Sequence, residues 1–276
     1  MKGPIVLLTI CFFLSFQLLA QEHKLVKLWE TDTVLKTPES VLFNPMNNFL
    51  YVSNINGHAA DKDENGSIGK VSLDGKIINV DWAKGLNAPK GMGLYKGILW
   101  VADIDQVVGI NTKNGVIEKK INVAGSTFLN DITIDNKGIV YVSDTRVNKV
   151  YGIENGKVTI LLENLKGPNG LFSIGDDLYI LDNGALLKMS KDKKVTTIAD
   201  GMEPSTDGLE TVDGHDFLVS CWVGAIYYVK ADGSKQKLLD TQTQKINSAD
   251  IGFDRVKRIV YVPTFLKNSI TAYELK

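Results

Sequence analysis

Six positions that recur along the chain could bring oxygen-bearing side chains to one point. Each stands at the start of a short strand-like segment. The residues at these positions are Glu39, Lys90, Asn130, Asn169, Asp207 and Ala249. Four of the six carry side-chain oxygens, a donor set that suits one hard divalent cation, with Ca²⁺ favoured. Mg²⁺ and Mn²⁺ suit the same donors, whereas Zn²⁺ suits them less well without histidine or cysteine.

The same residues also have a simpler interpretation as turns. Asn-Gly at 169–170 and Asp-Gly at 207–208 are turn-forming pairs, and Asn-Asp at 130–131 could form a turn as well. One such pair alone is more often a turn than a ligand. Matching places in different repeats favour a shared site, but the pattern leaves both interpretations open.

These positions belong to six repeated segments, each with a short strand, a turn and a second apolar strand that ends in a polar residue. The segments are 38–54, 89–103, 129–144, 168–182, 206–221 and 248–264. They recur about every forty residues, which is the length of a four-stranded propeller blade. Hairpin signals such as Asp74-Gly75 and Asn155-Gly156 separate further strand-like pieces, and no segment has a convincing long helical period.

The repeats predict an all-β fold, a six-bladed β-propeller with four-stranded blades. The sixth repeat ends after a third strand near residues 269–275. The strand-like segment 24–31 can supply the missing strand and close the ring, which would remove an exposed sheet edge. A β-sandwich is the main alternative, but six equal units with a divided last unit favour the propeller.

A second ring of side chains is expected where the second strand of each blade returns to the same face. The residues there are Asn54, Asp103, Asp144, Asp182, Cys221 and Thr264. The simplest role for the aspartates is to accept backbone hydrogen bonds at strand ends. The alternative is that this ring orients the inner ligands or the substrate, and Asn54 is predicted to contact substrate.

The first twenty residues are typical of a secretory signal peptide. Met1-Lys2 is followed by an apolar run at 5–19 and by Ala20, a small residue suited to cleavage. The run is too short for a membrane span, and no second apolar stretch follows. We expect a signal peptide at 1–20 and a single propeller domain at 21–276. The mature protein would then be periplasmic or secreted.

Composition limits the kind of core, the classes of partner and the disulfides that the chain can have. The chain has 276 residues, a formal net charge of −1 and 44% hydrophobic residues, so a sizeable core is expected. Scattered charges of both signs argue against nucleic acid and membrane surfaces as partners. After cleavage Cys221 is the remaining cysteine; we expect it to be a buried filler and expect no internal disulfide.

At these repeats the chain resembles the gluconolactonase, senescence marker protein and luciferin-regenerating enzyme family of six-bladed β-propellers. That family is similar to diisopropylfluorophosphatase and more distantly to paraoxonase. The resemblance covers the chain from about residue 24 to the end. It implies one catalytic divalent cation held by Glu39 in PESV, Asn130 in FLND, Asn169 in GPNGL and Asp207 in TDGLE.

Two features depart from the family pattern. Its sugar-acid lactonases carry an arginine two residues before the first metal-binding asparagine, where this chain has Phe128. The basic clamp for a polyhydroxy acid is therefore missing. The motif at Glu39 is PES in place of the more usual Glu-Gly-Pro.

The predicted function is hydrolysis of a lactone or related ester at the channel mouth. The cation would polarise the carbonyl, and Asp207 is predicted to be both a ligand and the general base. Lys90 is predicted to contact an anionic part of the substrate, with a solvated channel lysine as the alternative. Trp222 is predicted to form an apolar wall, with packing between blades as the alternative.

A binding module is the competing hypothesis, since a fold does not determine a function. An exported propeller with a structural Ca²⁺ would present an exposed patch to a ligand or protein. An enzyme requires four converging ligands below a pocket. We expect a small-molecule lactone or ester as partner, no nucleic acid, no membrane span, and a monomer.

Overall fold

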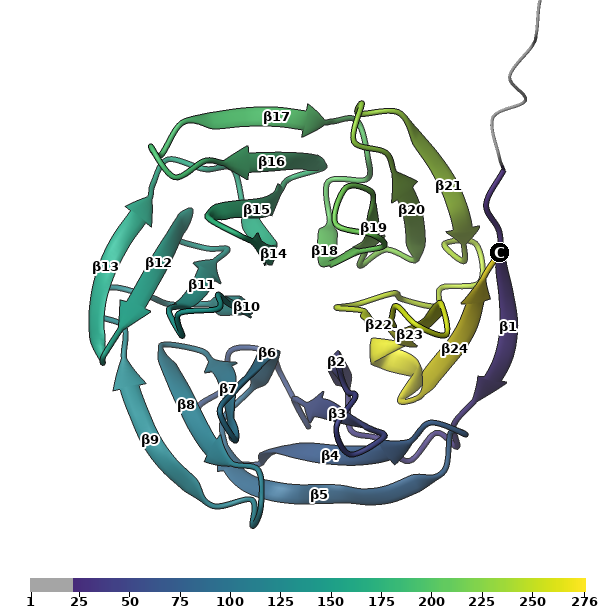
Figure 1. Ribbon diagram of the computed structural model, residues 1–276. Helices are drawn as coiled ribbons and strands as arrows, with labels where there is room; N and C mark the ends of the chain where they lie inside the picture. The colour runs from purple at the N-terminus through teal and green to yellow at the C-terminus, as the bar shows by residue number, and fades with distance from the viewer. Residues whose placement is uncertain (1–21) are drawn as a thin grey trace, which may run out of the picture.

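A computed structural model describes residues 22–276 as a ring of six blades around a central channel (Figure 1). Each blade is a four-stranded antiparallel sheet, which confirms the predicted six-bladed β-propeller. Within the described residues the one helix is the short 3-10 helix η1 (Phe265–Lys267), and no helix is long and apolar enough to cross a membrane. The predicted signal peptide at 1–20 lies outside the described residues.

The strands of each blade follow one another from the channel outward. Blades 1 to 3 are β2 (Pro38–Asn44), β3 (Phe49–Asn54), β4 (Gly66–Ser72), β5 (Ile77–Leu86); β6 (Pro89–Tyr95), β7 (Ile98–Asp103), β8 (Gln106–Asn111), β9 (Ile117–Asn122); and β10 (Leu129–Ile134), β11 (Val140–Asp144), β12 (Lys149–Glu154), β13 (Lys157–Leu162). Blades 4 to 6 are β14 (Pro168–Ile174), β15 (Asp177–Asp182), β16 (Ala185–Met189), β17 (Val195–Ala199); β18 (Thr206–Thr211), β19 (Phe217–Cys221), β20 (Ala225–Val229), β21 (Lys235–Asp240); and β22 (Gly252–Asp254), β23 (Ile259–Pro263), β24 (Ile270–Leu275), β1 (Leu25–Glu30).

The ring closes in the sixth blade, where β1 pairs with β24 as predicted. The register runs from Leu25 opposite Leu275 to Glu30 opposite Thr271. Lys24 N donates to the Lys276 carbonyl at 3.0 Å, and the reciprocal bond measures 2.9 Å. The two ends of the propeller domain are thus joined in one sheet, which covers an edge that β24 would otherwise expose.

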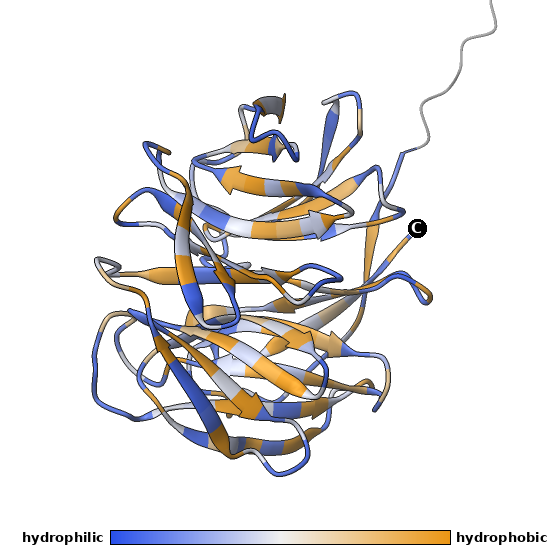
Figure 2. Ribbon diagram, turned by 60° about the vertical axis from the view of Figure 1, so that its left-hand side comes forward, coloured by the Kyte–Doolittle hydropathy of each residue, from blue (hydrophilic) through white to orange (hydrophobic). Residues whose placement is uncertain are grey.

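Apolar side chains pack between neighbouring blades. Orange and blue alternate along many strands in Figure 2, as expected for sheets whose buried positions have a period of two. One cluster joins Tyr51 and Ile68 of blade 1 to Leu99 and Val101 of blade 2. Cys221, fully buried in another such cluster, is the apolar filler that the sequence predicted.

Neighbouring inner strands approach one another closely around the channel. Asp250 N donates to the Glu39 carbonyl at 2.9 Å, which links the sixth blade to the first. A Cβ at Gly208 would lie 2.4 Å from Ile251 N, and a Cβ at Gly91 would lie 2.2 Å from the Asp131 carboxylate. Glycine is therefore needed where one inner strand passes the next.

Closure by β1 gives the first testable prediction. Val26 lies opposite Glu274, two residues from the mutually hydrogen-bonded pair Lys24 and Lys276, so its N–H is expected to point at β24. Val26→Pro removes that donor and should lower the Tm by several degrees in a thermal melt. Val26→Ala, which keeps the N–H, should lower it less. Equal melting of Val26→Pro and the wild type would show that this strand does not stabilise the ring.

Candidate functional site

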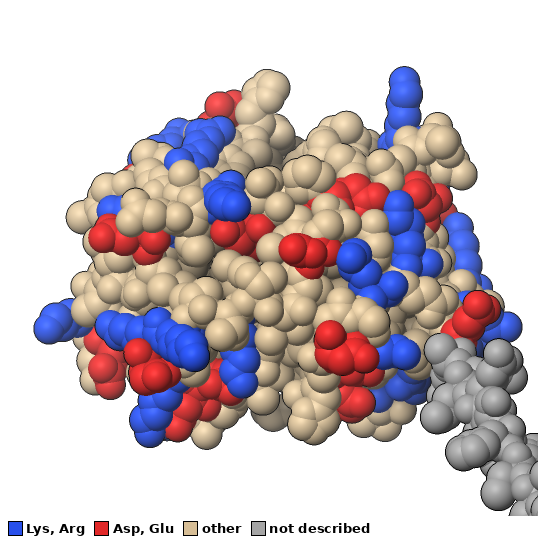
Figure 3. Space-filling view, turned by 90° about the horizontal axis from the view of Figure 1, so that it is seen from above, with Lys and Arg blue, Asp and Glu red and all other residues tan. Residues whose placement is uncertain are grey.

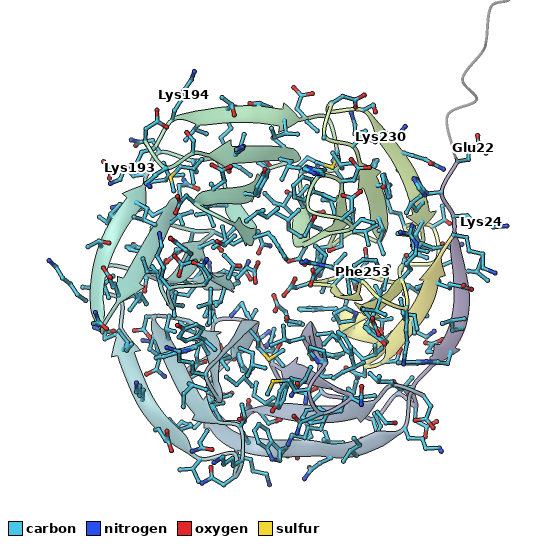
Figure 4. All side chains as sticks on the ribbon, in the orientation of Figure 1. Glu22, Lys24, Lys193, Lys194, Lys230 and Phe253 are labelled. Atoms are coloured by element: carbon cyan, nitrogen blue, oxygen red, sulfur yellow. The ribbon has the colours of Figure 1, made fainter. Side chains whose placement is uncertain are left out.

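The starts of the inner strands meet at one end of the channel, beside a cavity of about 440 Å³. Side chains from every blade reach toward the central opening, and oxygen atoms from several of them gather there (Figure 4). Five of the six predicted inner-ring residues line the cavity, namely Glu39, Lys90, Asn130, Asn169 and Asp207. Ala249 is fully buried and is not part of the lining.

Hydrogen bonds orient the two amides of this group. Asn169 Nδ2 donates to Asp207 Oδ1 at 2.8 Å. Asn130 Nδ2 donates to Thr145 Oγ1 at 2.9 Å, and Thr145 Oγ1 donates in turn to the Pro168 carbonyl at 2.8 Å. Both amide nitrogens are thus engaged, which leaves both amide oxygens for another partner. Sequence reasoning missed Thr145, although it follows directly on Asp144 of the second ring.

Two buried oxygens in this group have no hydrogen-bond partner among residues 22–276. They are Glu39 Oε2 and Asn169 Oδ1. An unpaired buried polar atom costs about 1–3 kcal/mol, so two in one cavity require an explanation. An oxygen-preferring cation would satisfy both atoms.

Burial and like charge disfavour ionisation of the two carboxyl groups. Burial raises the pKa of Glu39 well above its usual range, and the charges of Asp207 and Asp250 raise it further. Burial also raises the pKa of Asp207, with Asp250 adding to the effect and the Asn169 hydrogen bond opposing it. A bound cation would reverse this by favouring the ionised forms.

The donor set decides which cation fits. Within residues 22–276 no three His, Cys, Asp or Glu side chains form a metal-binding cluster. The candidate site instead combines two carboxylates, Glu39 and Asp207, with two amides, Asn130 and Asn169. Such all-oxygen sites fit Ca²⁺, and also Mg²⁺ or Mn²⁺, but fit Zn²⁺ poorly.

Lys90 is buried in the cavity wall with only 1% of its surface exposed, so it is not the solvated lysine of the alternative interpretation. Its Nζ donates to the carbonyls of Ala59 and Ala88 at 2.8 and 2.9 Å and lies 4.5 Å from the centre of the Phe128 ring. Burial lowers the pKa of Lys90 to about 8, with the Glu39 charge opposing. Its position suits charge compensation and attachment of the Ala59 loop better than capture of a substrate anion.

The second ring caps the loops that lead into the inner strands. Asp144 Oδ2 accepts from Thr127 N at 2.7 Å and from Phe128 N at 3.1 Å. Asp103 accepts in the same way from the backbone two residues before Lys90. These bonds match the capping role that the sequence indicated.

Asn54 requires a correction. We predicted that it contacts substrate, but it is fully buried and lies outside the cavity lining. Its Oδ1 accepts from Lys36 N at 3.2 Å and its Nδ2 donates to the Val80 carbonyl at 3.0 Å. The strand end turns this side chain toward the backbone of its own blade, where it performs the capping role of its ring.

Trp222 lines the cavity and is 37% exposed. Its ring meets that of Phe265 edge-on, with 5.5 Å between ring centres. Phe265 belongs to η1, outside the repeat pattern, and was not predicted.

No histidine of the described chain lines the cavity. His58 is exposed on a loop, and His23 stacks on Tyr228 at a centroid distance of 3.9 Å.

Below the mouth, a smaller cavity of about 180 Å³ is lined by three further acids, Asp131, Glu210 and Asp250. Burial raises the pKa of Asp250 to about 7, although the Ser40 hydroxyl donates to it. Burial likewise raises the pKa of Glu210 to about 8, with Arg255 opposing and Asp250 contributing. On the face of the molecule shown in Figure 3, by contrast, acidic and basic side chains are interspersed.

No protein-family model matches the chain, and no curated protein matches it. Solved structures do. One described as a "putative gluconolactonase" is 15% identical with a TM-score of 0.67, covering 92% of each chain. Virginiamycin B lyase from Staphylococcus aureus, with quinupristin, is 16% identical with a TM-score of 0.66, covering 92% of this chain and 100% of that one.

A third match comes from a nidogen/laminin complex. It is 17% identical with a TM-score of 0.67, covering 79% of this chain and 84% of that chain. These likenesses show the fold. The matches include proteins described as enzymes and a protein in a nidogen/laminin complex, so the fold alone does not select between catalysis and binding.

The raised pKa of Glu210 predicts that the free energy of unfolding depends on pH. Since Glu210 binds its proton more tightly when folded, the free energy of unfolding of metal-free protein should fall as the pH rises from about 4.5 to about 8. Glu210→Gln removes the contribution of this residue and should make the fall less steep in urea melts at a series of pH values. The exposed control Glu154→Gln should keep the wild-type slope. Identical slopes for all three proteins would contradict the assignment.

Proposed function

We propose that this protein is a divalent-metal-dependent hydrolase that opens a lactone or a related ester at the mouth of the propeller channel. One observation carries the proposal. Four oxygen-bearing residues from blades 1, 3, 4 and 5 meet at one cavity, and two of their buried oxygens have no partner in the described chain. The fold shared with a protein described as a "putative gluconolactonase" agrees with this function.

Glu39, Asn130, Asn169 and Asp207 would hold the ion, for which Ca²⁺ is the best fit. When bound, the cation would supply Lewis acidity at the substrate carbonyl and neutralise the two carboxylates. Lys90 stays in the wall as a fixed positive charge, held by two backbone carbonyls.

Asp207 is the proposed general base. Its Oδ1 accepts from Asn169 Nδ2, which fixes the carboxylate and leaves Oδ2 to take a proton from the attacking water. The water oxygen bonds to the carbonyl carbon, the ring C–O bond breaks, and the leaving oxygen takes up the proton that Asp207 accepted from the water, which returns Asp207 to its carboxylate form. The product of a lactone is then a hydroxy acid.

The proposed base is a carboxylate, whereas the change described for the lyase structure is at a histidine. The Staphylococcus aureus structure carries a histidine-to-alanine change and is described as catalytically inactive. In residues 22–276 of this chain no histidine lines the cavity, and the carboxylate of Asp207 is the proposed base instead. The composition of residues 1–20 supports export, so we propose that the mature enzyme acts in the periplasm or outside the cell.

A non-enzymatic binding module with a structural Ca²⁺ is the second candidate. The likeness to a propeller from the nidogen/laminin complex favours it. Such a module needs the ion but not an open cavity beside it. The cavity of about 440 Å³ next to Asp207 therefore weighs toward catalysis.

The function is tested with chelator-treated mature protein. Ca²⁺ at one hundred times its Kd should raise stability by about 2.7 kcal/mol, seen as a rise in Tm, and should restore hydrolysis across a panel of lactones and aryl esters. Asp207→Asn should lose hydrolysis and most of the Ca²⁺-dependent rise in Tm. The exposed control Asp200→Asn should behave as wild type. A Ca²⁺-dependent rise in Tm with no hydrolysis would support the binding module instead.

Thr145 gives an independent test of the ligand geometry. Thr145→Val removes the hydroxyl that orients Asn130 and should weaken Ca²⁺ affinity about 10–100-fold in calorimetry. Thr145→Ser keeps the hydroxyl and should bind Ca²⁺ nearly as well as the wild type. Unchanged affinity in Thr145→Val would remove Asn130 from the proposed ligand set.

A further inference from the structure

Aromatic side chains stand on opposite sides of the cavity. Phe128 directly precedes β10, whereas Phe265 lies in η1 and Trp222 follows β19. In Figure 1, β10 and η1 lie across the central channel from one another. The four proposed ligands Glu39, Asn130, Asn169 and Asp207, here called the quartet, therefore have aromatic residues on both sides.

Phe128 is held in place by two cations. Lys90 Nζ lies 4.5 Å from the ring centre, and the Arg146 guanidinium lies 4.3 Å from it. The Phe128 N–H is also tied to Asp144. These contacts fix the position of the ring, which lines the cavity on this side.

The opposite wall is equally well supported. Trp222 N donates to the Ser205 carbonyl at 2.7 Å, and the Trp222 carbonyl accepts from Asn247 Nδ2 at 2.9 Å. Phe265 adopts a φ of 48°, which bulky residues rarely do, and packs on an apolar cluster that contains Ile55. A strained backbone kept beside a cavity is typical of a position fixed for function.

Apart from the four proposed metal ligands, few polar side-chain groups of the cavity lining are free to bind a substrate rich in hydroxyls. The Thr145 hydroxyl is used by Asn130 and Pro168, and Thr206 is 3% exposed with its Oγ1 accepting from Gly184 N. Lys90 already donates to two carbonyls. Ser205 Oγ accepts only a long bond, from Val223 N at 3.3 Å. Hydroxyl groups of a sugar acid would lose water here without gaining enough partners.

We propose that the site selects lactones and esters whose non-reacting part is apolar, an alkyl chain or an aromatic ring, and disfavours polyhydroxy sugar-acid lactones. This rests on the proposed hydrolase function and identifies its substrate class. The reacting carbonyl lies at the quartet, and the apolar substituent lies between Phe128 on one side and Trp222 with Phe265 on the other.

The test compares three substrates with Ca²⁺-loaded mature protein: a δ-lactone with a pentyl side chain, unsubstituted δ-valerolactone and glucono-δ-lactone. We expect kcat/KM to be at least roughly tenfold higher for the pentyl lactone than for either of the others. Trp222→Ala should reduce this preference severalfold, whereas Trp222→Phe should largely keep it. Leu28→Ala, on the exposed side of β1, is the control for an unrelated loss of apolar surface.

A binding measurement separates the two proposals. The pentyl-substituted δ-lactam resists hydrolysis, and calorimetry can follow its binding to wild type and to Trp222→Ala whether or not any lactone turns over. If lactam binding weakens in Trp222→Ala and no ester is turned over, the hydrolase function is contradicted. The apolar binding site is still supported in that case. Preferred turnover of glucono-δ-lactone would overturn the substrate class and leave the hydrolase function standing. Absence of lactam binding to the wild type would also overturn the substrate class.

Discussion

The burial of like charges around one axis is the constraint on which the site depends. Glu39, Asp131, Asp207, Glu210 and Asp250 come from four blades, and burial raises the pKa of each. Lys90 opposes only part of this charge. A chain that retains such a cluster either keeps protons on it or recruits a cation, and the unpaired oxygens at the mouth favour the cation there.

The ring makes this burial possible because it leaves the inner strands no freedom to separate. Backbone hydrogen bonds of Asp250 with Glu39 and Val41 join the last blade to the first, and β1 covers the outer edge of the last blade. Glycine at 91, 170 and 208 lets neighbouring inner strands approach, so the residue before each glycine faces the channel mouth. Asp103 and Asp144 fix the loops that lead into two inner strands, β6 and β10.

Much of the architecture could be predicted from the sequence because it repeats. Six similar segments and a divided last unit determine the number of blades, and the repeat register alone placed the quartet at matching strand starts. Features outside the repeat were not predictable. Phe265 lies in a short helix with no counterpart in other blades, and the burial of Lys90 depends on the Ala59 loop of the neighbouring blade. Asn54 was misassigned because a ring position does not reveal which way its side chain turns.

The central claim is that Glu39, Asn130, Asn169 and Asp207 together bind one divalent cation. Crystals of the mature protein soaked in Mn²⁺ would test this most directly, through the anomalous signal of the metal. We predict one strong peak at the channel mouth with oxygens of all four residues at roughly 2.0–2.6 Å. The absence of a peak there at saturating Mn²⁺, or a peak only among Asp131, Glu210 and Asp250, would contradict the account.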